Sequence, residues 1–145
     1  FVHESMRLHP ASPVALRIAT EEVTLRSGVT IEAGEEVRAE VELANRDPSV
    51  FGEHADAFDP FRPLPDEVAR WGLSFGHGGH ACLGRELAGG LEPDGSSELH
   101  LAGAVTLMAQ RMLAAGARPD PDDPPSADPT TTRAMWGRYP VRFGP

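Results

Sequence analysis

The only cysteine of the chain, Cys82, lies in residues 75–84, a segment that also contains four glycines and two histidines. Backbone N–H groups of a tight glycine-rich turn can point at a sulfur atom. A helix that begins directly after Cys82 would also place its positive dipole end beside this sulfur. A thiolate stabilised in this way serves as a nucleophile or as a soft metal ligand. The segment therefore predicts chemistry at Cys82.

Three other interpretations of Cys82 are open at this point. Cys82 could bind zinc with His77 and His80, because Cys and His are zinc ligands. However, H-x-x-H-x-C is not a standard zinc spacing, and the chain has no second cysteine. Cys82 could instead be a nucleophile with His80 as its base. It could also be an inert buried thiol, although the glycines around it are poor material for a core.

Several charged residues could form ion pairs with one another or bind a charged ligand. Glu4 and Arg7 share one face of a helix, and alone they would form a surface ion pair worth roughly a few tenths of a kcal/mol. Arg62 could add a third charge, since a carboxylate between two arginines forms a rigid buried network. Arg17, inside an apolar strand, either faces outward or lines a site for a carboxylate ligand. Residues 45–48 predict a turn with an Asx cap.

Composition limits the classes of function. The chain has 145 residues, 40% of them hydrophobic, which is enough for one domain with a core. A formal net charge of -9 argues against non-specific nucleic-acid binding and against a polybasic membrane anchor. The chain contains no apolar run of about 18 residues and no signal-peptide pattern. A single cysteine suits a reducing cytoplasm.

The first half of the chain predicts one helix followed by short strands. Residues 1–9 have the pattern of a helix that ends before Pro10, and the chain begins inside this helix, as a piece of a longer protein would. Strand patterns follow at residues 14–19, 22–25, 29–31 and 36–44. Residues 51–74 predict an irregular packed loop.

The second half predicts two helices and an extended end. A helix is expected over residues 83–88, followed by an interruption at 89–95. A longer helix is expected from the N-cap Ser97 to Ala115, with Gly116 after its end. Residues 118–130 are rich in proline and aspartate and predict an extended linker. Residues 135–137 and 139–143 predict an edge strand.

Taken together, these segments resemble cytochromes P450 of the soluble bacterial type. Glu-Ser-Met-Arg, Arg-Ile-Ala-Thr-Glu, Ala-Asn-Arg-Asp-Pro, Phe-Asp-Pro-Phe-Arg and the cysteine segment occur in the order of that family. The cysteine segment matches the haem-loop pattern F-x-x-G-x-x-x-C-x-G at every fixed position. The resemblance implies a mainly α fold with short β strands. It also implies that residues 1–145 are the C-terminal, proximal part of one P450 domain, incomplete as given.

The resemblance implies a role for each matching residue. Cys82 would be the thiolate ligand of the iron of haem b, where it favours O–O cleavage. His80 and Arg17 would pair with the haem propionates, Phe75 would pack near the thiolate, and Gly76 and Gly84 would allow close approach of the backbone. The structural triad behind the haem would consist of Glu4, Arg7 and Arg62. No catalytic residue beyond the haem ligand is expected in this segment.

The function that the resemblance implies is that of a cytoplasmic haem-thiolate monooxygenase. It would oxidise a small apolar organic substrate with O₂ and electrons from a ferredoxin-type donor. The remaining N-terminal portion of the enzyme, or a partner chain, would complete the site, and neither nucleic acid nor a membrane is expected as a partner. The alternatives are a truncated, non-catalytic P450-like scaffold or activator of another enzyme, and a peroxide-using haem protein.

Overall fold

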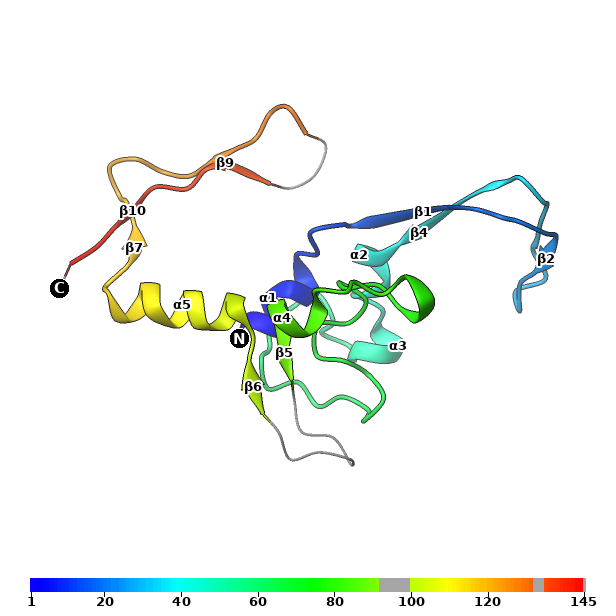
Figure 1. The fold of residues 1–145 in the computed structure, drawn as a ribbon, viewed down its shortest axis with the longest axis horizontal. Coiled ribbons are helices and arrows are strands. Elements are labelled where there is room, and N and C mark those ends of the chain that lie inside the picture. The colour runs from blue at the N-terminus through cyan, green and yellow to red at the C-terminus, as the bar shows by residue number, and fades with distance from the viewer. Residues whose placement is uncertain (92–99, 132–134, 145) are drawn as a thin grey trace. The chain divides into compact units, whose positions relative to one another are not determined.

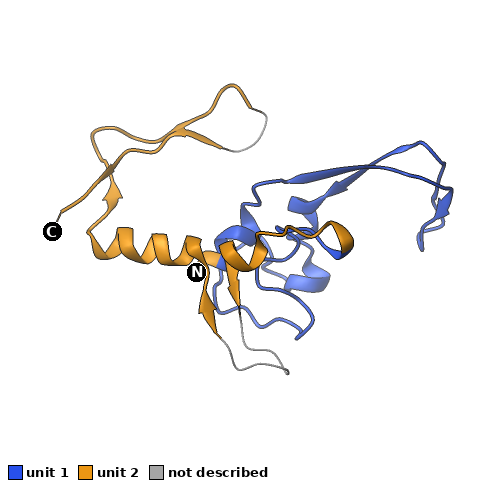
Figure 2. Cartoon of the chain, in the orientation of Figure 1, with its two compact units in different colours: residues 1, 3–78 blue, residues 2, 79–145 orange. Residues whose placement is uncertain are grey.

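The computed structural model describes residues 1–91, 100–131 and 135–144, and it divides the chain into two compact units. Unit 1 contains residues 1 and 3–78, and unit 2 contains residues 2 and 79–145 (Figure 2).

Unit 1 begins with helix α1, Val2–Leu8, as the sequence predicts. It ends at Leu8, with His9 as its C-cap, because Pro10 has no N–H to continue the helix. Two helices of one turn follow later in unit 1, α2 at Val41–Ala44 and α3 at Pro48–Phe51. Asp47 caps α3, since its carboxylate accepts a hydrogen bond from the Ser49 N–H at 2.8 Å. The expected turn with an Asx cap is therefore also the start of a helix.

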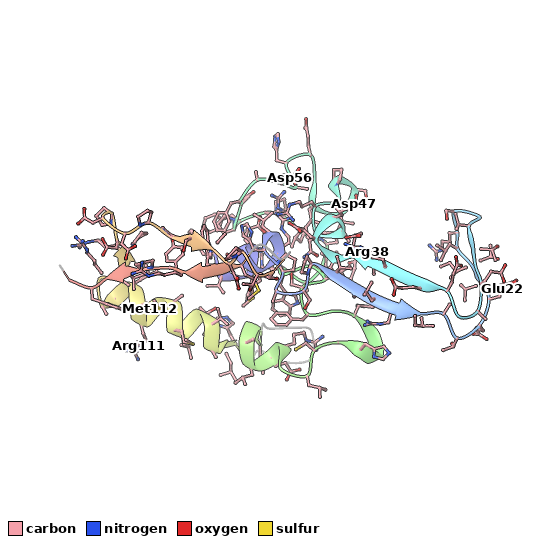
Figure 3. All side chains as sticks on the ribbon, turned by 90° about the horizontal axis from the view of Figure 1, so that it is seen from above. Glu22, Arg38, Asp47, Asp56, Arg111 and Met112 are labelled. Carbon is pink, nitrogen blue, oxygen red and sulfur yellow. The ribbon has the colours of Figure 1, made fainter. Side chains whose placement is uncertain are left out.

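The strands of unit 1 form a long arm (Figure 1). Strand β1, Val14–Ile18, pairs antiparallel with β4, Glu36–Glu40, and Val14 lies opposite Glu40. Beyond them, β2 at Val23–Thr24 pairs with β3 at Thr30–Ile31. Figure 3 shows Glu22 at the far end of this arm and Arg38 nearer its base. The strand pattern expected over residues 36–44 ends earlier, because the last four residues form α2.

The core of unit 1 mixes apolar and charged side chains. The buried apolar residues are Leu8, Val41, Phe51 and Ala55. Beside them Glu4, Arg7, Asn45 and Arg62 are buried as well. Residues 52–77 contain turns but no helix or strand, so the irregular segment expected over residues 51–74 is confirmed except at Phe51, which ends α3.

Unit 2 carries the cysteine and a longer helix. The single-turn η1, Gly78–His80, crosses from unit 1 into unit 2 and precedes α4, Arg85–Gly89. Strand β5, Gly90–Leu91, then pairs antiparallel with β6, Leu101–Ala102. Helix α5, Ala104–Ala114, follows directly.

The long helix predicted over residues 97–115 begins later than expected. Leu101 and Ala102 are in β6, because their backbone groups pair with β5. The predicted cap Ser97 lies outside the described residues. The predicted end of the helix is confirmed: Gly116 has φ +75°, and its N–H donates to the Leu113 carbonyl at 2.9 Å. Together with the bond from the Ala117 N–H to Met112 O, this is a Schellman ending, which favours glycine.

The end of the chain forms two short ladders. Strand β7, Arg118–Pro119, pairs with β10, Val141–Arg142, and β8, Ser126–Ala127, pairs with β9, Trp136–Arg138. The extended stretch predicted over residues 118–130 therefore pairs with the edge strand predicted over residues 135–137 and 139–143. Across the described residues, helix exceeds strand only slightly, and a mainly α fold is not confirmed.

Candidate functional site

Cys82 lies on an open part of unit 2. Its thiol is free and exposed, and the next residue, Leu83, and Leu87 of the following helix are exposed as well. A Cβ added at Gly79 would meet no atom within 4 Å. An accessible soft sulfur flanked by apolar side chains and an uncrowded glycine turn fits the donor chemistry and the approach that a haem iron requires.

Helix α4 gives Cys82 less electrostatic support than the sequence indicated. The helix begins at Arg85 rather than Leu83 and has only 5 residues. The first turn of α4 therefore does not follow Cys82 directly, although the sequence predicts that it does. The contact from this helix is a hydrogen bond from the Arg85 N–H to the Cys82 carbonyl at 3.2 Å. A Cβ at Gly84 would lie 3.8 Å from Cys82 Sγ, which is ordinary van der Waals contact.

The zinc interpretation gains no support from the structure. Within residues 1–91, 100–131 and 135–144, no group of three or more His, Cys, Asp and Glu side chains could hold a metal ion. His80, at the end of η1, is exposed, and in the described part of the chain no hydrogen bond joins it to Cys82. The pair therefore lacks the contact that an activated nucleophile requires.

The segment that leads to Cys82 is held in unit 1 by aromatic contacts. The ring of Phe75 packs edge-on against Trp71, with 5.4 Å between ring centroids. Trp71 packs edge-on against His3 of α1 at 4.9 Å. Gly76 has φ +72°, a left-handed conformation that glycine adopts without strain. The predicted site residues Phe75 and Gly76 therefore begin a turn that is anchored on the first helix.

Arg17 lies on β1 and is exposed. Its Nη1 donates to the carbonyl of Leu16 at 2.7 Å, and among the described residues no carboxylate pairs with it. The other N–H groups of its guanidinium can donate hydrogen bonds to an anion.

The structure brings the three residues Glu4, Arg7 and Arg62 together inside unit 1. Their exposed fractions are 5%, 0% and 6%. Arg7 donates to Glu4 through Nε at 2.8 Å and through Nη2 at 2.7 Å. Arg62 Nη2 lies 3.5 Å from Glu4 Oε1, and the Asp59 N–H donates to the same oxygen at 3.0 Å. One carboxylate thus lies between two buried guanidinium groups.

Arg62 is bound mainly by backbone carbonyls. Its Nη1 donates to Phe51 O, and its Nη2 donates to His54 O at 2.8 Å and to Ala57 O at 2.9 Å. The guanidinium of Arg7 also lies 4.8 Å from the ring centroid of Phe51. The network therefore ties α1 to the irregular segment 51–62 through both charge and carbonyl contacts.

The Glu4 carboxyl has a lowered pKa. Burial raises this pKa, but the hydrogen bonds from Arg7 and from the Asp59 N–H, with the charges of Arg7 and Arg62, outweigh burial. The net pKa lies below the ordinary value of 4.5, so Glu4 is ionised at neutral pH. The network consequently carries one negative and two positive charges.

Sequence reasoning missed Asn45, which is fully buried. Its Nδ2 donates to the Arg7 carbonyl at 2.9 Å and contacts Ser74 Oγ at 3.0 Å, and its Oδ1 accepts from the Leu73 N–H at 2.7 Å. Asn45 was assigned to a turn, which asparagine also favours. The position of Asn45 in the matching motif Ala-Asn-Arg-Asp-Pro was the available signal.

Comparison with known proteins identifies the family. A sequence model described as cytochrome P450 matches residues 1–89, more than half of the chain, and these residues include Cys82 and all three residues of the buried network. The chain belongs to the cytochrome P450 family. Family membership implies a haem cofactor.

Individual relatives agree with this assignment. The chain is 43% identical over 88 residues to the biotin biosynthesis cytochrome P450 of Bacillus subtilis, a match over 60% of this chain and 20% of that protein. It is 42% identical over 89 residues to the cytochrome P-450 monooxygenase DoxA of Streptomyces sp. strain C5, a match over 61% and 19%. The matched segment is therefore about a fifth of the length of these relatives.

Solved P450 structures extend the likeness past residue 89. The structure of CYP154A1 from Streptomyces coelicolor matches 99% of this chain and 32% of its own length, with a TM-score of 0.70 and 31% identity.

The described helices include none with the length and apolar character that crossing a membrane requires.

Proposed function

We propose that residues 1–145 form the haem-binding, C-terminal part of one P450 domain, and that the protein is a haem-thiolate monooxygenase. The observation that carries this proposal is the free, exposed thiol of Cys82 within the segment that matches the P450 family. Cys82 would be the thiolate ligand, and haem b, when bound, would supply the oxygen chemistry. One oxygen atom of O₂ would enter a small apolar substrate and the other would leave as water, with electrons from a ferredoxin-type donor.

The remaining site residues would bind and support the haem. Arg17 and His80 are exposed cations or potential cations, and each could donate charge-assisted hydrogen bonds to a propionate. Phe75 would pack near the thiolate, and Gly76 and Gly84 would keep its surroundings free of side chains. Other parts of the polypeptide, or a partner chain, would complete the substrate pocket.

The Glu4, Arg7 and Arg62 network would support the site without touching the substrate. Its charges are paired and buried within unit 1, so the proposed role is to fix the backbone behind the haem. A buried carboxylate between two arginines resists rearrangement because breaking either pair leaves an unpaired charge.

The proposal is tested on the complete natural polypeptide that contains this sequence, supplied with haem. We expect the reduced, CO-bound protein to show a thiolate-type Soret band, and Cys82→Ser to bind haem without that band. Ser12→Ala, an exposed change outside the site, serves as the matched control and should retain the band. A haem-loaded protein without the thiolate band would overturn the proposal. The scaffold alternative would gain support if a bound partner enzyme were equally active with Cys82→Ser.

A further inference from the structure

The segment 72–74, which leads into the cysteine turn, contacts helix α1 through hydrogen bonds. Ser74 Oγ donates to the Met6 carbonyl at 2.7 Å, and Asn45 Nδ2 contacts the same oxygen of Ser74 at 3.0 Å. The amide of Asn45 therefore lies between the end of α1 and the start of the cysteine turn.

Every polar group of Asn45 has a partner. Besides the side-chain contacts given above, its backbone N–H donates to Val41 O at 2.9 Å, and its carbonyl accepts a hydrogen bond from Arg7 Nη1. Arg7 and Asn45 thus exchange hydrogen bonds in both directions, since the Asn45 amide donates back to the Arg7 carbonyl. Because both residues are fully buried, water is not available to replace any of these contacts.

The position requires an amide rather than a carboxylate or an apolar side chain. The side chain must donate to the Arg7 carbonyl and accept from the Leu73 N–H at the same time. Asparagine offers two donors and one acceptor in the required plane, whereas aspartate would place an acceptor against the Arg7 carbonyl. Gly72 completes the fit, because a Cβ there would overlap Asn45 Oδ1 and lie 2.9 Å from Asn45 Cγ.

Asn45 performs a task that the Glu4, Arg7 and Arg62 network does not perform. The hydrogen bonds of Glu4 and Arg62 to the backbone reach Asp59 and residues 51–57, and Arg70 in turn contacts Arg62 O. None of these bonds, among the described contacts, reaches residues 72–74. Asn45 connects the network, through Arg7, to the segment that continues into Phe75, Gly76 and the cysteine turn.

We propose that Asn45 is a positioning residue for the thiolate ligand: by fixing Leu73 and Ser74 on the end of α1, it sets the path along which the chain delivers Cys82 to the haem iron. This inference rests on the proposed function. A looser segment 72–74 would let the turn shift, and Cys82 would then ligate the haem iron less completely.

The test measures the CO-bound spectrum of the complete, haem-loaded polypeptide at a temperature where circular dichroism shows all variants folded. For Asn45→Asp we expect the ratio of the thiolate-type to the non-thiolate Soret band to fall about tenfold, the change that about 1.4 kcal/mol produces. Asp47→Asn, two residues away, is the matched control. Its carboxylate contacts only Ser49 among the described residues, and an amide keeps that cap, so the ratio should not change.

A second pair of variants covers the case in which Asn45→Asp does not fold. Ser74→Ala removes the hydroxyl that links Asn45 to Met6, and the ratio should fall by roughly fivefold, since two part-buried hydrogen bonds are lost. Ser74→Thr keeps the hydroxyl and should restore the ratio. A purely structural role would lower the melting temperature of these variants but leave the ratio in the folded protein unchanged.

The outcomes separate this inference from the proposed function. If the unmodified, haem-loaded protein lacks the thiolate band, the proposed function fails. If the unmodified protein has the band, and folded Asn45→Asp and Ser74→Ala both keep its full ratio, the proposed role of Asn45 is wrong although the proposed function stands.

Discussion

Unit 1 and unit 2 bury different kinds of groups. Unit 1 encloses two arginines, a glutamate and an asparagine, and their hydrogen bonds join segments that are far apart in sequence. In the described part of unit 2, the buried residues are Gly89, Gly90 and Gly103, which let backbone pack on backbone. Arg111 and Met112 of α5, by contrast, project outward (Figure 3).

This difference shows two ways in which a chain can hold its segments in place. In unit 1 each element is fixed by named polar side chains, so single substitutions should have large and specific effects. In unit 2 the backbone segments pack closely because the buried glycines have no side chain. Substitutions at these glycines should therefore act through steric overlap.

The largest effect is expected for Glu4→Ala. This change leaves two buried guanidinium groups without their carboxylate, and the free energy of unfolding should fall by about 3–5 kcal/mol. The matched control is Glu42→Ala, which removes the exposed partner of Arg46 and should cost no more than about 0.5 kcal/mol. Urea titration of both variants measures the difference. Equal stabilities would show that the buried network does not hold unit 1 together.

Arg17→Ala and His80→Ala test the two proposed propionate partners. Each variant should weaken haem binding by about 1.5–3 kcal/mol, the value of one hydrogen bond to a charged group. The rate at which each variant loses haem to a scavenging protein measures its haem retention. Arg38→Ala is the control, because Arg38 lies on the neighbouring strand β4 and pairs with Glu40. Unchanged retention in both variants would remove Arg17 and His80 from the proposed site.

Gly103→Ala tests the backbone packing of unit 2. An added Cβ would overlap the Ala88 carbonyl oxygen and lie 2.5 Å from the Gly89 carbonyl carbon. Because backbone atoms cannot move away as a side chain can, we expect a loss of about 1–3 kcal/mol. Gly79→Ala is the control, since an added Cβ there meets no atom within 4 Å. A neutral result for Gly103→Ala, measured by thermal unfolding, would contradict the close approach of α4 and α5.

The stability of unit 1 should depend on pH through Glu4. Its pKa is lower in the folded protein than the ordinary value of 4.5, so its contribution is complete above 4.5 and is lost as the pH falls through the folded pKa. The stability difference between the unmodified protein and Glu4→Gln should therefore be constant above about pH 5.5 and should shrink in more acidic solution. A difference that stays constant down to acid unfolding would be inconsistent with an ionised, paired Glu4.

The smallest effect is expected for Arg142→Ala at the end of the chain. Arg142 pairs with Asp120 at 2.8 Å and with Asp122 at 2.6 Å, but all three groups are accessible to water. Solvent and salt screen such pairs, so the thermal midpoint should not change measurably. A clear decrease that disappears at high salt would indicate that β7 and β10 depend on charge after all.

The sequence was sufficient to predict features that depend on local chemistry. Pro10 and Gly116 marked the ends of α1 and α5, because one lacks an N–H and the other tolerates a left-handed conformation. The charges of Glu4, Arg7 and Arg62 suggested a buried network, and the pattern around Cys82 indicated the family.

Other features could not be predicted because they depend on partners that are distant in sequence. The start of α5 was placed too early, since the pairing of Leu101 with Leu91 cannot be inferred from the local pattern. Asn45 lies in the predicted turn, but its buried contacts at Arg7 and Leu73 were missed, since these partners lie 38 and 28 residues away. Local periodicity contains no information about such contacts.

The amino-acid sequence alone therefore indicated the family, which charges can pair and where α1 and α5 must end. These properties follow from side-chain chemistry and from the backbone limits of proline and glycine. Only the tertiary structure decided that Arg7 and Asn45 exchange hydrogen bonds in a fully buried position, and that Gly72 leaves room for the Asn45 amide. Burial and hydrogen-bond direction arise when distant segments pack together, and a linear pattern does not specify them.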